Sequence, residues 1–188
     1  MGERIVNVHK QEYKGKKFRS TLETKTAQTL DALGIPYQYE ERKIILMDGF
    51  KSPFQKEKVR SVTYTPDFII GPIMLECKGF ETPEWKLKRK LVFKYLLENE
   101  PETLFYQLHD AKASLLKMLD NHWACLGVAI KVTNKPTKKE PAKSQIFDSI
   151  AQALEELNIG YCPLGSIMSG LTGKRDYIKN YKWELVKV

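Results

Sequence analysis

The order of apolar and polar residues predicts a helix near the start of the chain, followed by a strand. Residues 21–33 have apolar side chains at helical spacing on one face. Ser20 is a suitable N-cap for this helix, and Gly34 is a suitable residue at its end. The apolar segment over residues 35–46 then predicts one continuous strand, and the Asp-Gly pair shortly after it is typical of a turn.

A β-hairpin is the next predicted element, and it follows a polar and basic loop over residues 49–60. Two short apolar runs, residues 64–70 and 73–79, are separated only by Gly71-Pro72. A Gly-Pro pair between two apolar runs is typical of a tight turn. The two runs therefore predict two antiparallel strands.

A second helix and a further strand extend this pattern. Residues 83–97 predict the helix, and residues 103–108 predict the strand. The order up to this point is one helix, three strands, one helix and one strand. Such an order favours a mixed sheet with helices packed against it, in the α/β class.

The remaining part of the chain predicts fewer elements. The pattern predicts, in order, a helix over 111–119, a strand over 126–132, a Pro- and Lys-rich linker over 134–144, an amphipathic helix over 147–157 and a closing strand over 182–188. We expect these elements to form a C-terminal α/β extension that packs on the core.

A chain of 188 residues is long enough for one domain with a large extension. The predicted division is a basic N-terminal arm over residues 1–19, a core over 20–110 and the C-terminal extension over 111–188. The arm has six basic residues against two acids. It is either a solvated terminus or a segment that contacts DNA.

The composition indicates an anionic partner. The net charge is +8 and the pI is about 9.2, and nucleic acid is the commonest partner of such a chain. The three cysteines are odd in number and widely spaced, which favours reduced thiols in a cytoplasmic protein over a disulfide framework. The sequence has neither an apolar signal region nor a run of about 18 apolar residues, so we expect no membrane anchor.

The predicted hairpin brings two acids and a lysine to one edge. Residues two apart on a strand point to the same side, so Glu76 and Lys78 share a face. A turn at Gly71-Pro72 places Asp67 opposite Glu76, with Cβ atoms about 5 Å apart. Two carboxylates at that spacing repel each other unless a cation lies between them, and Mg²⁺ prefers such oxygen ligands. The alternative is a solvated Glu-Lys pair near a Pro-Asp turn.

The Pro-Asp pair at Asp67, followed by Glu76-Cys77-Lys78, resembles the signature of the PD-(D/E)XK nuclease superfamily, and residues 18–110 are similar to its small phage-type endonucleases. The resemblance implies a restriction-endonuclease-like αβββαβ core and Mg²⁺-dependent phosphodiester hydrolysis, with Mn²⁺ as a substitute. It implies that Asp67, Glu76 and the backbone carbonyl of Cys77 bind the metal, which activates water and polarises the phosphoryl oxygen. It also implies that Lys78 orients or deprotonates the attacking water.

An acid from the first helix is a further candidate, because many members of this superfamily add one there. Glu23 shares the face of the apolar residues, so we expect it to point toward the sheet as a catalytic residue and metal ligand. The alternative is a capping box, in which the Glu23 side chain bonds back to the amide of the cap residue, Ser20.

The helix over residues 83–97 carries five candidates for DNA binding, namely Lys86, Lys88, Arg89, Lys90 and Lys94. Three of them are spaced four apart, which is either a solvated face or a ridge that follows the phosphate backbone. Lys88 falls on the apolar side of the helix, so it must extend to water or meet an anion. We therefore expect Lys88 to lie near the candidate site.

These features predict a metal-dependent DNA endonuclease. It is either structure-specific, as a junction-resolving homodimer resembling phage enzymes, or a sequence-specific homing or restriction-like endonuclease that reads bases with residues 111–188. One rival hypothesis is a nucleic-acid-binding module without catalysis, and another is a nuclease subunit that needs a partner protein. The expected location is the cytoplasm, which for a phage-encoded protein is that of the host cell.

Overall fold

The structure is a computed structural model and describes residues 10–188. Arg4 and the other early residues of the predicted N-terminal arm lie outside this range. Contacts between residues divide the chain into two compact units. The first comprises the described residues up to Pro36 together with Asp110–Val188, and the second comprises Tyr37–His109.

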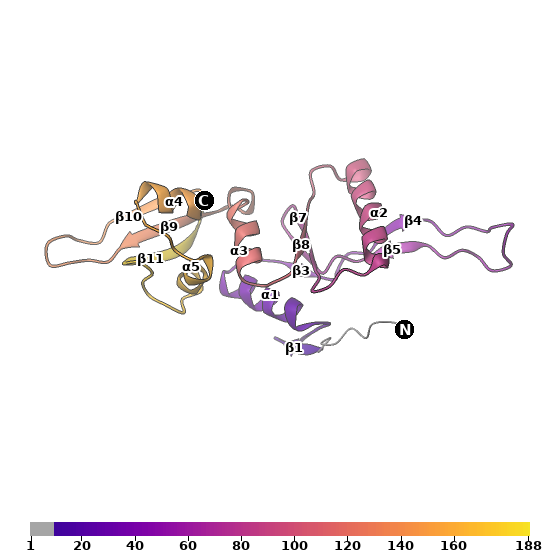
Figure 1. Cartoon of the computed structure of the whole chain (residues 1–188), viewed down its shortest axis with the longest axis horizontal. Helices are drawn as coiled ribbons and strands as arrows, with labels where there is room; N and C mark the ends of the chain where they lie inside the picture. Colours follow the sequence, from indigo (N-terminus) through magenta and orange to yellow (C-terminus); the bar gives the residue numbers. More distant parts are fainter. Residues whose placement is uncertain (1–9) are drawn as a thin grey trace. The chain divides into compact units, whose positions relative to one another are not determined.

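The second unit is built on a four-stranded mixed sheet in the order β3-β6-β7-β8 (Figure 1). β3 (Gln38–Tyr39) is antiparallel to β6 (Phe68–Ile70), and β6 is antiparallel to β7 (Ile73–Cys77). β8 (Leu104–Leu108) is parallel to β7 and is reached through α2 (Pro83–Asn99), since parallel neighbours need a crossover connection. The predicted mixed sheet and hairpin are confirmed.

The strand predicted over residues 35–46 is wrong as one continuous element. The chain forms β3, bends at Glu40, whose φ is +51°, and only then forms β4 (Ile44–Met47). A positive φ at a non-glycine residue interrupts extended backbone, so the two strands join different partners. β4 pairs antiparallel with β5 (Val62–Tyr64), which the sequence pattern did not predict as a separate strand.

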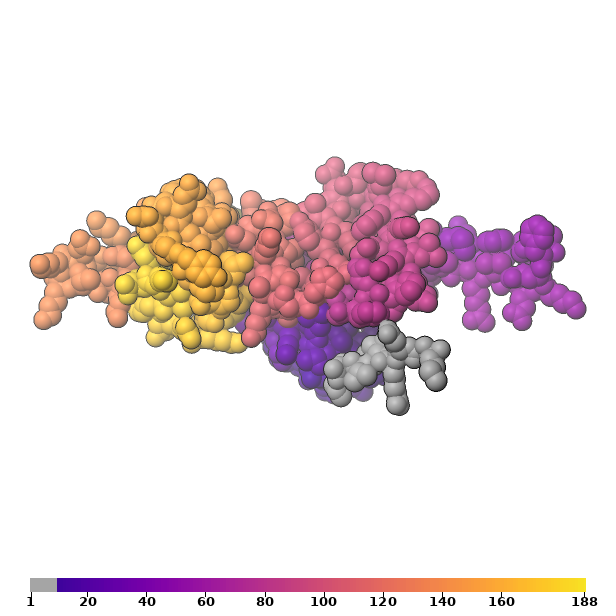
Figure 2. Space-filling model, in the orientation of Figure 1, coloured from indigo at the N-terminus to yellow at the C-terminus, as the bar shows by residue number. Residues whose placement is uncertain are grey.

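β4 and β5 continue into a hairpin that projects from the second unit, and we call its residues 48–61 the projecting hairpin (Figures 1 and 2). The Asp-Gly turn predicted after β4 is wrong, because the two chain segments stay paired beyond it through a bridge between Phe50 and Val59. The chain turns at Pro53-Phe54 instead. The predicted polar loop is therefore the outer part of a paired structure.

α2 begins where the sequence predicts it, because capping and packing agree. Thr82 is the N-cap, and its hydroxyl accepts a hydrogen bond of 3.2 Å from the amide of Trp85. Pro83 lies in the first turn, where a missing amide hydrogen costs little. The helix buries Trp85, Val92 and Leu96 in one apolar cluster with residues of β4, β5 and β7. This cluster joins the helix, the root of the projecting hairpin and the sheet.

The first unit begins with a hairpin and a helix. β1 (Gln11–Tyr13) pairs with β2 (Lys16–Phe18), and the ring of Phe18 is buried. The described part of the predicted arm is therefore folded. α1 (Thr21–Ala32) follows, and Ser20 is its N-cap as predicted.

The first unit also contains a three-stranded antiparallel sheet in the order β10-β9-β11. The elements of this part are α3 (Ala113–Asp120), the short 3₁₀-helix η1 (Ala124–Leu126), β9 (Val128–Asn134), β10 (Ser144–Phe147), α4 (Ile150–Glu156), α5 (Leu164–Leu171) and β11 (Tyr181–Lys187). The predicted helix over 111–119 and the predicted strands over 126–132 and 182–188 are confirmed, with shifts of one or two residues at their ends.

Two predictions for this part are wrong. Residues 134–144 are not a linker, because they connect β9 to β10 as the loop of a hairpin within one sheet. The helix predicted over residues 147–157 begins only at Ile150, since Phe147 belongs to β10 and Ser149 caps the helix. In both cases the antiparallel pairing of β10 with β9 decides the structure of residues that the local pattern assigned to a linker or a helix.

α5 is a helix that the sequence pattern did not predict. Two glycines and two serines among its eight residues lower its intrinsic helix propensity. A Cβ atom added at Gly170 would lie 3.2 Å from a side-chain atom of Ile178 and 3.4 Å from Trp183 of β11. Close packing against this part of the unit, more than local propensity, therefore places α5.

These elements establish a mixed α/β fold. With β4 and β5 left aside, α1, β3, β6, β7, α2 and β8 follow one another in the predicted αβββαβ order. The two units divide between His109 and Asp110, and α1 belongs by its contacts to the first unit. The predicted division into arm, core and extension stays a prediction. None of the helices within residues 10–188 has the length and apolar character that a membrane span requires.

Candidate active site

The β6–β7 hairpin has the register that the turn predicts. Phe68 lies opposite Leu75, and the chain reverses at Gly71, whose φ of +55° suits glycine. The next pair along this register is Asp67 and Glu76. Asp67 is held there by a hydrogen bond of 2.7 Å, which its Oδ2 atom accepts from the amide that follows Glu76.

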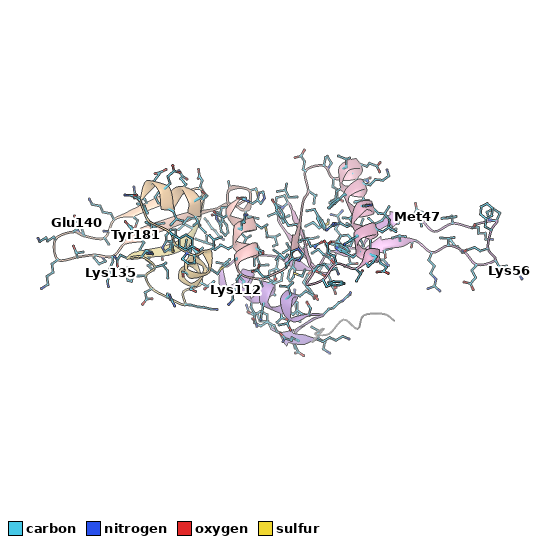
Figure 3. All side chains as sticks on the ribbon, viewed as in Figure 1. Met47, Lys56, Lys112, Lys135, Glu140 and Tyr181 are labelled. Atoms are coloured by element: carbon cyan, nitrogen blue, oxygen red, sulfur yellow. The ribbon has the colours of Figure 1, made fainter. Side chains whose placement is uncertain are left out.

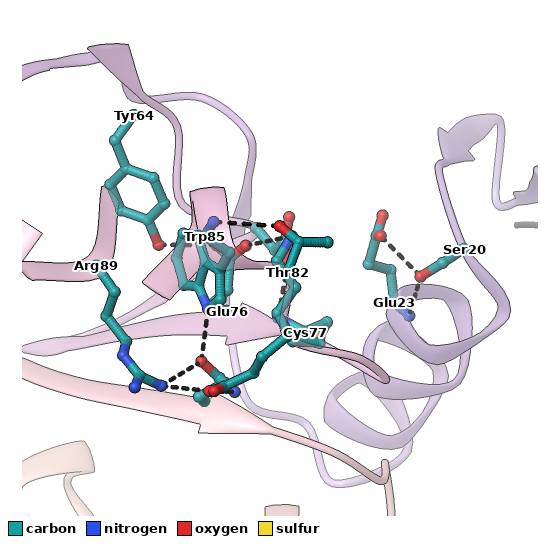
Figure 4. A network of polar contacts seen from close by, with 12 residues as sticks. Ser20, Glu23, Tyr64, Glu76, Cys77, Thr82, Trp85 and Arg89 are labelled. Atoms are coloured by element: carbon teal, nitrogen blue, oxygen red, sulfur yellow. Dashed lines mark hydrogen bonds and ion pairs between the residues drawn. The ribbon is translucent and has the colours of Figure 1, made fainter. Parts of the chain in front are cut away.

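Glu76 is buried with a partner on each carboxylate oxygen (Figure 4). The hydroxyl of Tyr64 donates a hydrogen bond of 2.8 Å to Oε2. The Nζ atom of Lys78 lies 2.9 Å from Oε1, as the shared strand face predicts. The structure therefore brings together Asp67, Glu76 and Lys78, and it adds Tyr64 from β5.

The surroundings of Glu76 act on its pKa in opposite directions. Burial raises the pKa of this carboxyl above its ordinary value, and the ammonium of Lys78 lowers the pKa by a smaller amount. Burial, followed by the neighbouring charge of Glu76, strongly raises the pKa of Tyr64. The Tyr64 hydroxyl therefore keeps its proton at neutral pH and acts as a donor.

Backbone hydrogen bonds fix the position of Lys78, which directly follows β7. Its amide donates a hydrogen bond of 2.8 Å to the carbonyl of Leu108. Its own carbonyl lies 2.7 Å from Nδ1 of His109, which is exposed just after β8. The Nζ atom lies 5.0 Å from the ring centre of Trp85, within the range of a cation–π contact. These contacts fix the direction in which the ammonium leaves the backbone.

A polar network on α2 and β8 supports the same region (Figure 4). Gln107 accepts a hydrogen bond of 2.8 Å from the indole of Trp85 and one of 3.1 Å from Arg89. Its amide nitrogen donates to Glu81 over 2.7 Å, and Glu81 also forms an ion pair with Arg89. The network ties α2 to β8 beside the Lys78 ammonium.

The five basic candidates of α2 fall into three groups. Lys86, Lys90 and Lys94 are exposed, and Lys94 forms an ion pair with Glu98. Arg89 is bound within the Gln107 network. Lys88 is half-buried, and its Nζ atom lies 6.0 Å from the ring centre of Tyr64. Lys88 thus lies near the candidate site, as its place on the apolar side of the helix predicts.

Glu23 lies in the first unit and takes part in the cap of α1. Ser20 Oγ accepts a hydrogen bond of 3.2 Å from the Glu23 amide and donates one of 2.7 Å to Oε1 of Glu23. Oε2 accepts from the amide of Arg19 over 2.9 Å. The capping interaction is therefore present, although the backbone amide bound is that of Arg19 and not that of Ser20. The catalytic and metal-binding role of Glu23 stays a prediction.

The donor set of the hairpin suits a cation of the Mg²⁺ type. Mg²⁺ commonly binds through one or two carboxylates, with waters and a substrate phosphate in its other positions. Asp67 and Glu76 supply two buried carboxylates, and the carbonyl of Cys77 lies between Glu76 and Lys78 in the chain. Within residues 10–188 no group of three or more His, Cys, Asp or Glu side chains is arranged to hold a metal ion.

Sequence reasoning missed two parts of this site. Tyr64 lies just before the Pro-Asp motif, and the sequence pattern predicted no role for it. No pattern of neighbouring residues indicates that its hydroxyl reaches Glu76. Gln107 belonged to a correctly predicted strand, and its alternation along β8 could have placed it on the face of α2. Both contacts join segments that are distant in sequence.

The candidate site has two buried carboxylates that face each other across a hairpin, with a lysine beside them. This arrangement, on a chain of net charge +8, is typical of a nuclease. Comparison with protein families agrees, since residues 4–107, more than half of the chain, match the model of phage endonuclease I. The protein belongs to the phage endonuclease I family. Comparisons with curated proteins and with solved structures gave no match. The predicted similarity to phage-type endonucleases is confirmed, and assignment to the PD-(D/E)XK superfamily stays a prediction.

Proposed function

We propose that the protein is a Mg²⁺-dependent endonuclease that hydrolyses phosphodiester bonds of branched DNA, and that it is of the PD-(D/E)XK type. The observation that carries the proposal is the arrangement of Asp67, Glu76 and Lys78. Asp67 and Glu76 place two buried carboxylates at one end of the β6–β7 hairpin, and the Nζ atom of Lys78 lies 2.9 Å from Glu76. A site for a phosphate requires a further cation there.

Each residue has a distinct task in this proposal. Asp67, Glu76 and the Cys77 carbonyl would hold the metal, while a metal-binding role of Glu23 stays a prediction from the sequence. When bound, Mg²⁺ supplies a water of lowered pKa and polarises the phosphoryl oxygen. Lys78 orients the attacking water and offsets charge on the scissile phosphate. The exposed lysines of α2 bind the phosphate backbone, and Mn²⁺ can replace Mg²⁺.

Among the possible kinds of DNA endonuclease, we favour a junction-resolving enzyme, whose substrate is branched DNA. The family contains phage endonucleases. Cutting both strands of a branch within one bound complex requires two copies of the site, so we propose a homodimer. A sequence-specific enzyme would instead cut a linear duplex at a defined position, and a binding module would not cut.

The test compares cleavage of a four-way junction and of linear duplex DNA, each with Mg²⁺ and with a chelator. We expect Mg²⁺-dependent cleavage of the junction, and a loss of about 100-fold or more in Asp67→Asn and in Lys78→Ala. Lys187→Ala removes an exposed lysine at the chain end and should cut like the wild type. Cleavage that survives in either site variant, or in the chelator, would overturn the proposal.

A further inference from the structure

The projecting hairpin is a tightly closed structure. The amide of Phe50 donates to the Val59 carbonyl over 3.0 Å, and the amide of Val59 donates to the Phe50 carbonyl over 2.8 Å. A Cβ atom added at Gly49 would lie 2.9 Å from the Val59 carbonyl oxygen and 3.0 Å from the Ser61 amide nitrogen. Only a glycine lets the two segments approach so closely at the root. These contacts hold the two segments of the hairpin together near its root.

The root of this hairpin is anchored to the candidate site. Ile44 of β4 and Tyr64 of β5 are buried in the apolar cluster with Trp85 of α2 and Met74 of β7. The hydroxyl of Tyr64 donates to Glu76. The hairpin thus starts from the residue that contacts the candidate catalytic carboxylate, within one compact unit.

The hairpin presents positive charge to solvent. Its residues 48–61 include four basic side chains against two acids, and all four are exposed, namely Lys51, Lys56, Lys58 and Arg60. Within residues 10–188 none of these four forms an ion pair. By contrast, Lys94 of α2 is paired with an acid. Exposed cations without acidic partners are suited to binding phosphates.

An aromatic ring stands at the tip. Phe54 is 95% exposed, and its amide donates to the hydroxyl of Ser52 over 3.2 Å in the turn. In the described part of the chain its ring contacts no other aromatic ring and no cation. Bases within a continuous duplex are already stacked, whereas a branch offers unstacked bases to such a ring.

The reach of the hairpin matches the dimensions of DNA. Phe54 precedes Tyr64 by ten residues in the chain. At about 3.3 Å per residue in extended backbone, the tip lies up to about 33 Å from the root. This length equals about ten base pairs at about 3.4 Å each. Figure 3 labels Met47 at the end of β4 and Lys56 near the outer end of the projecting hairpin.

We propose that the projecting hairpin is a DNA-binding arm. Its four cations bind phosphates up to about one helical turn from the Asp67–Glu76 pair, and Phe54 stacks on bases that a branch leaves unstacked. The proposal rests on the proposed function in that DNA is the substrate. It adds a recognition element that lies outside the basic helix α2.

The test measures DNA binding without divalent metal, so that it does not depend on cleavage. The hairpin variant combines Lys51→Gln, Lys56→Gln, Lys58→Gln and Arg60→Gln. The control removes the same number of charges from the loop between β9 and β10 (Figure 3), through Lys135→Gln, Lys138→Gln, Lys139→Gln and Lys143→Gln. We expect the hairpin variant to reduce the salt dependence of binding by about 0.9 in log–log slope for each phosphate that the hairpin no longer neutralises, clearly more than the control.

The second variant, Phe54→Ala, tests the tip. We expect it to weaken binding of a four-way junction by about 5- to 100-fold and binding of a continuous duplex by less than about 2-fold. Phe54→Trp should restore junction binding and show a fluorescence change on adding DNA. Circular dichroism and thermal unfolding establish that the variants keep the fold, since all the changed side chains are exposed.

The outcomes separate this inference from the proposed function. Equal losses in the hairpin and control variants, or wild-type binding by the hairpin variant, would overturn the inference even in a protein that cleaves DNA with Mg²⁺. A selective loss of binding in a protein that does not cleave DNA would support the inference and overturn the proposed function. Equal effects of Phe54→Ala on junction and duplex would overturn the role of the tip.

Discussion

Glu76 illustrates how a single buried carboxylate is stabilised. Removing it from water is unfavourable, and the protein supplies two donors in place of water, the Tyr64 hydroxyl at 2.8 Å and the Lys78 ammonium at 2.9 Å. The two donors have different origins, since Lys78 directly follows the strand of Glu76 and Tyr64 belongs to β5. Burial still raises the pKa of Glu76, so these donors offset only part of the cost.

Tyr64 is therefore expected to position Glu76. Tyr64→Phe keeps the buried ring and removes only the hydroxyl, which leaves Oε2 of Glu76 without this donor. Groups that orient a metal ligand typically change metal affinity or activity by about 10- to 100-fold when removed. We expect a loss of this size, seen as a higher Mg²⁺ concentration at half-maximal cleavage or a lower maximal rate.

The matched control is Tyr161→Phe, which removes a hydroxyl from a tyrosine that is 88% exposed. It should leave the Mg²⁺ titration unchanged. Thermal unfolding shows whether Tyr64→Phe affects the fold. Identical titrations for Tyr64→Phe and the wild type would remove Tyr64 from the site.

At the scale of elements, the β6–β7 register and the β4–β5 pair together form the candidate site. The β6–β7 hairpin determines which residues face each other, and the β4–β5 pair brings Tyr64 to them. The root of the projecting hairpin depends on Gly49, where an added Cβ would meet the backbone of the opposite segment at 2.9 and 3.0 Å. Backbone atoms in a paired hairpin have little freedom to move away.

Gly49→Ala should consequently open the projecting hairpin. We expect a local cost of about 1–3 kcal/mol, the usual range for forcing an extra carbon into a packed position. Hydrogen exchange at the amides of Phe50 and Val59 measures this cost directly, since these amides form the hydrogen bonds of the bridge. Gly160→Ala is the control, because an added Cβ there has no heavy atom within 4 Å. Unchanged protection in Gly49→Ala would show that the hairpin tolerates a side chain at its root.

At the scale of the whole molecule, the number of sites per particle determines how DNA is cut. Residues 10–188 of one chain contain a single arrangement of Asp67, Glu76 and Lys78, whereas resolution of a junction needs two cuts. We therefore expect a homodimer, with a mass about twice the 21.8 kDa of one chain in sedimentation experiments at micromolar concentration. A plasmid carrying an extruded cruciform should yield linear product without a long-lived nicked form. A single-chain mass with mainly nicked product would contradict the dimer.

The sequence by itself determined the parts of this protein that depend on neighbours along the chain. The caps at Ser20 and Thr82 and the apolar spacing set the two main helices, because capping and periodicity are local. The Gly-Pro turn and the two-residue alternation of strands set the register of Asp67 against Glu76 and the shared face of Lys78. The family assignment agrees with the predicted similarity to phage-type endonucleases.

Only the tertiary structure decided which distant segments meet. The break at Glu40 separated β3 from β4, and this freed β4 to pair with β5 and deliver Tyr64 to Glu76. Gln107 reaches Trp85 only because β8 lies parallel to β7 beneath α2. Such contacts depend on side-chain packing and strand pairing between residues far apart in sequence, and no local pattern encodes them.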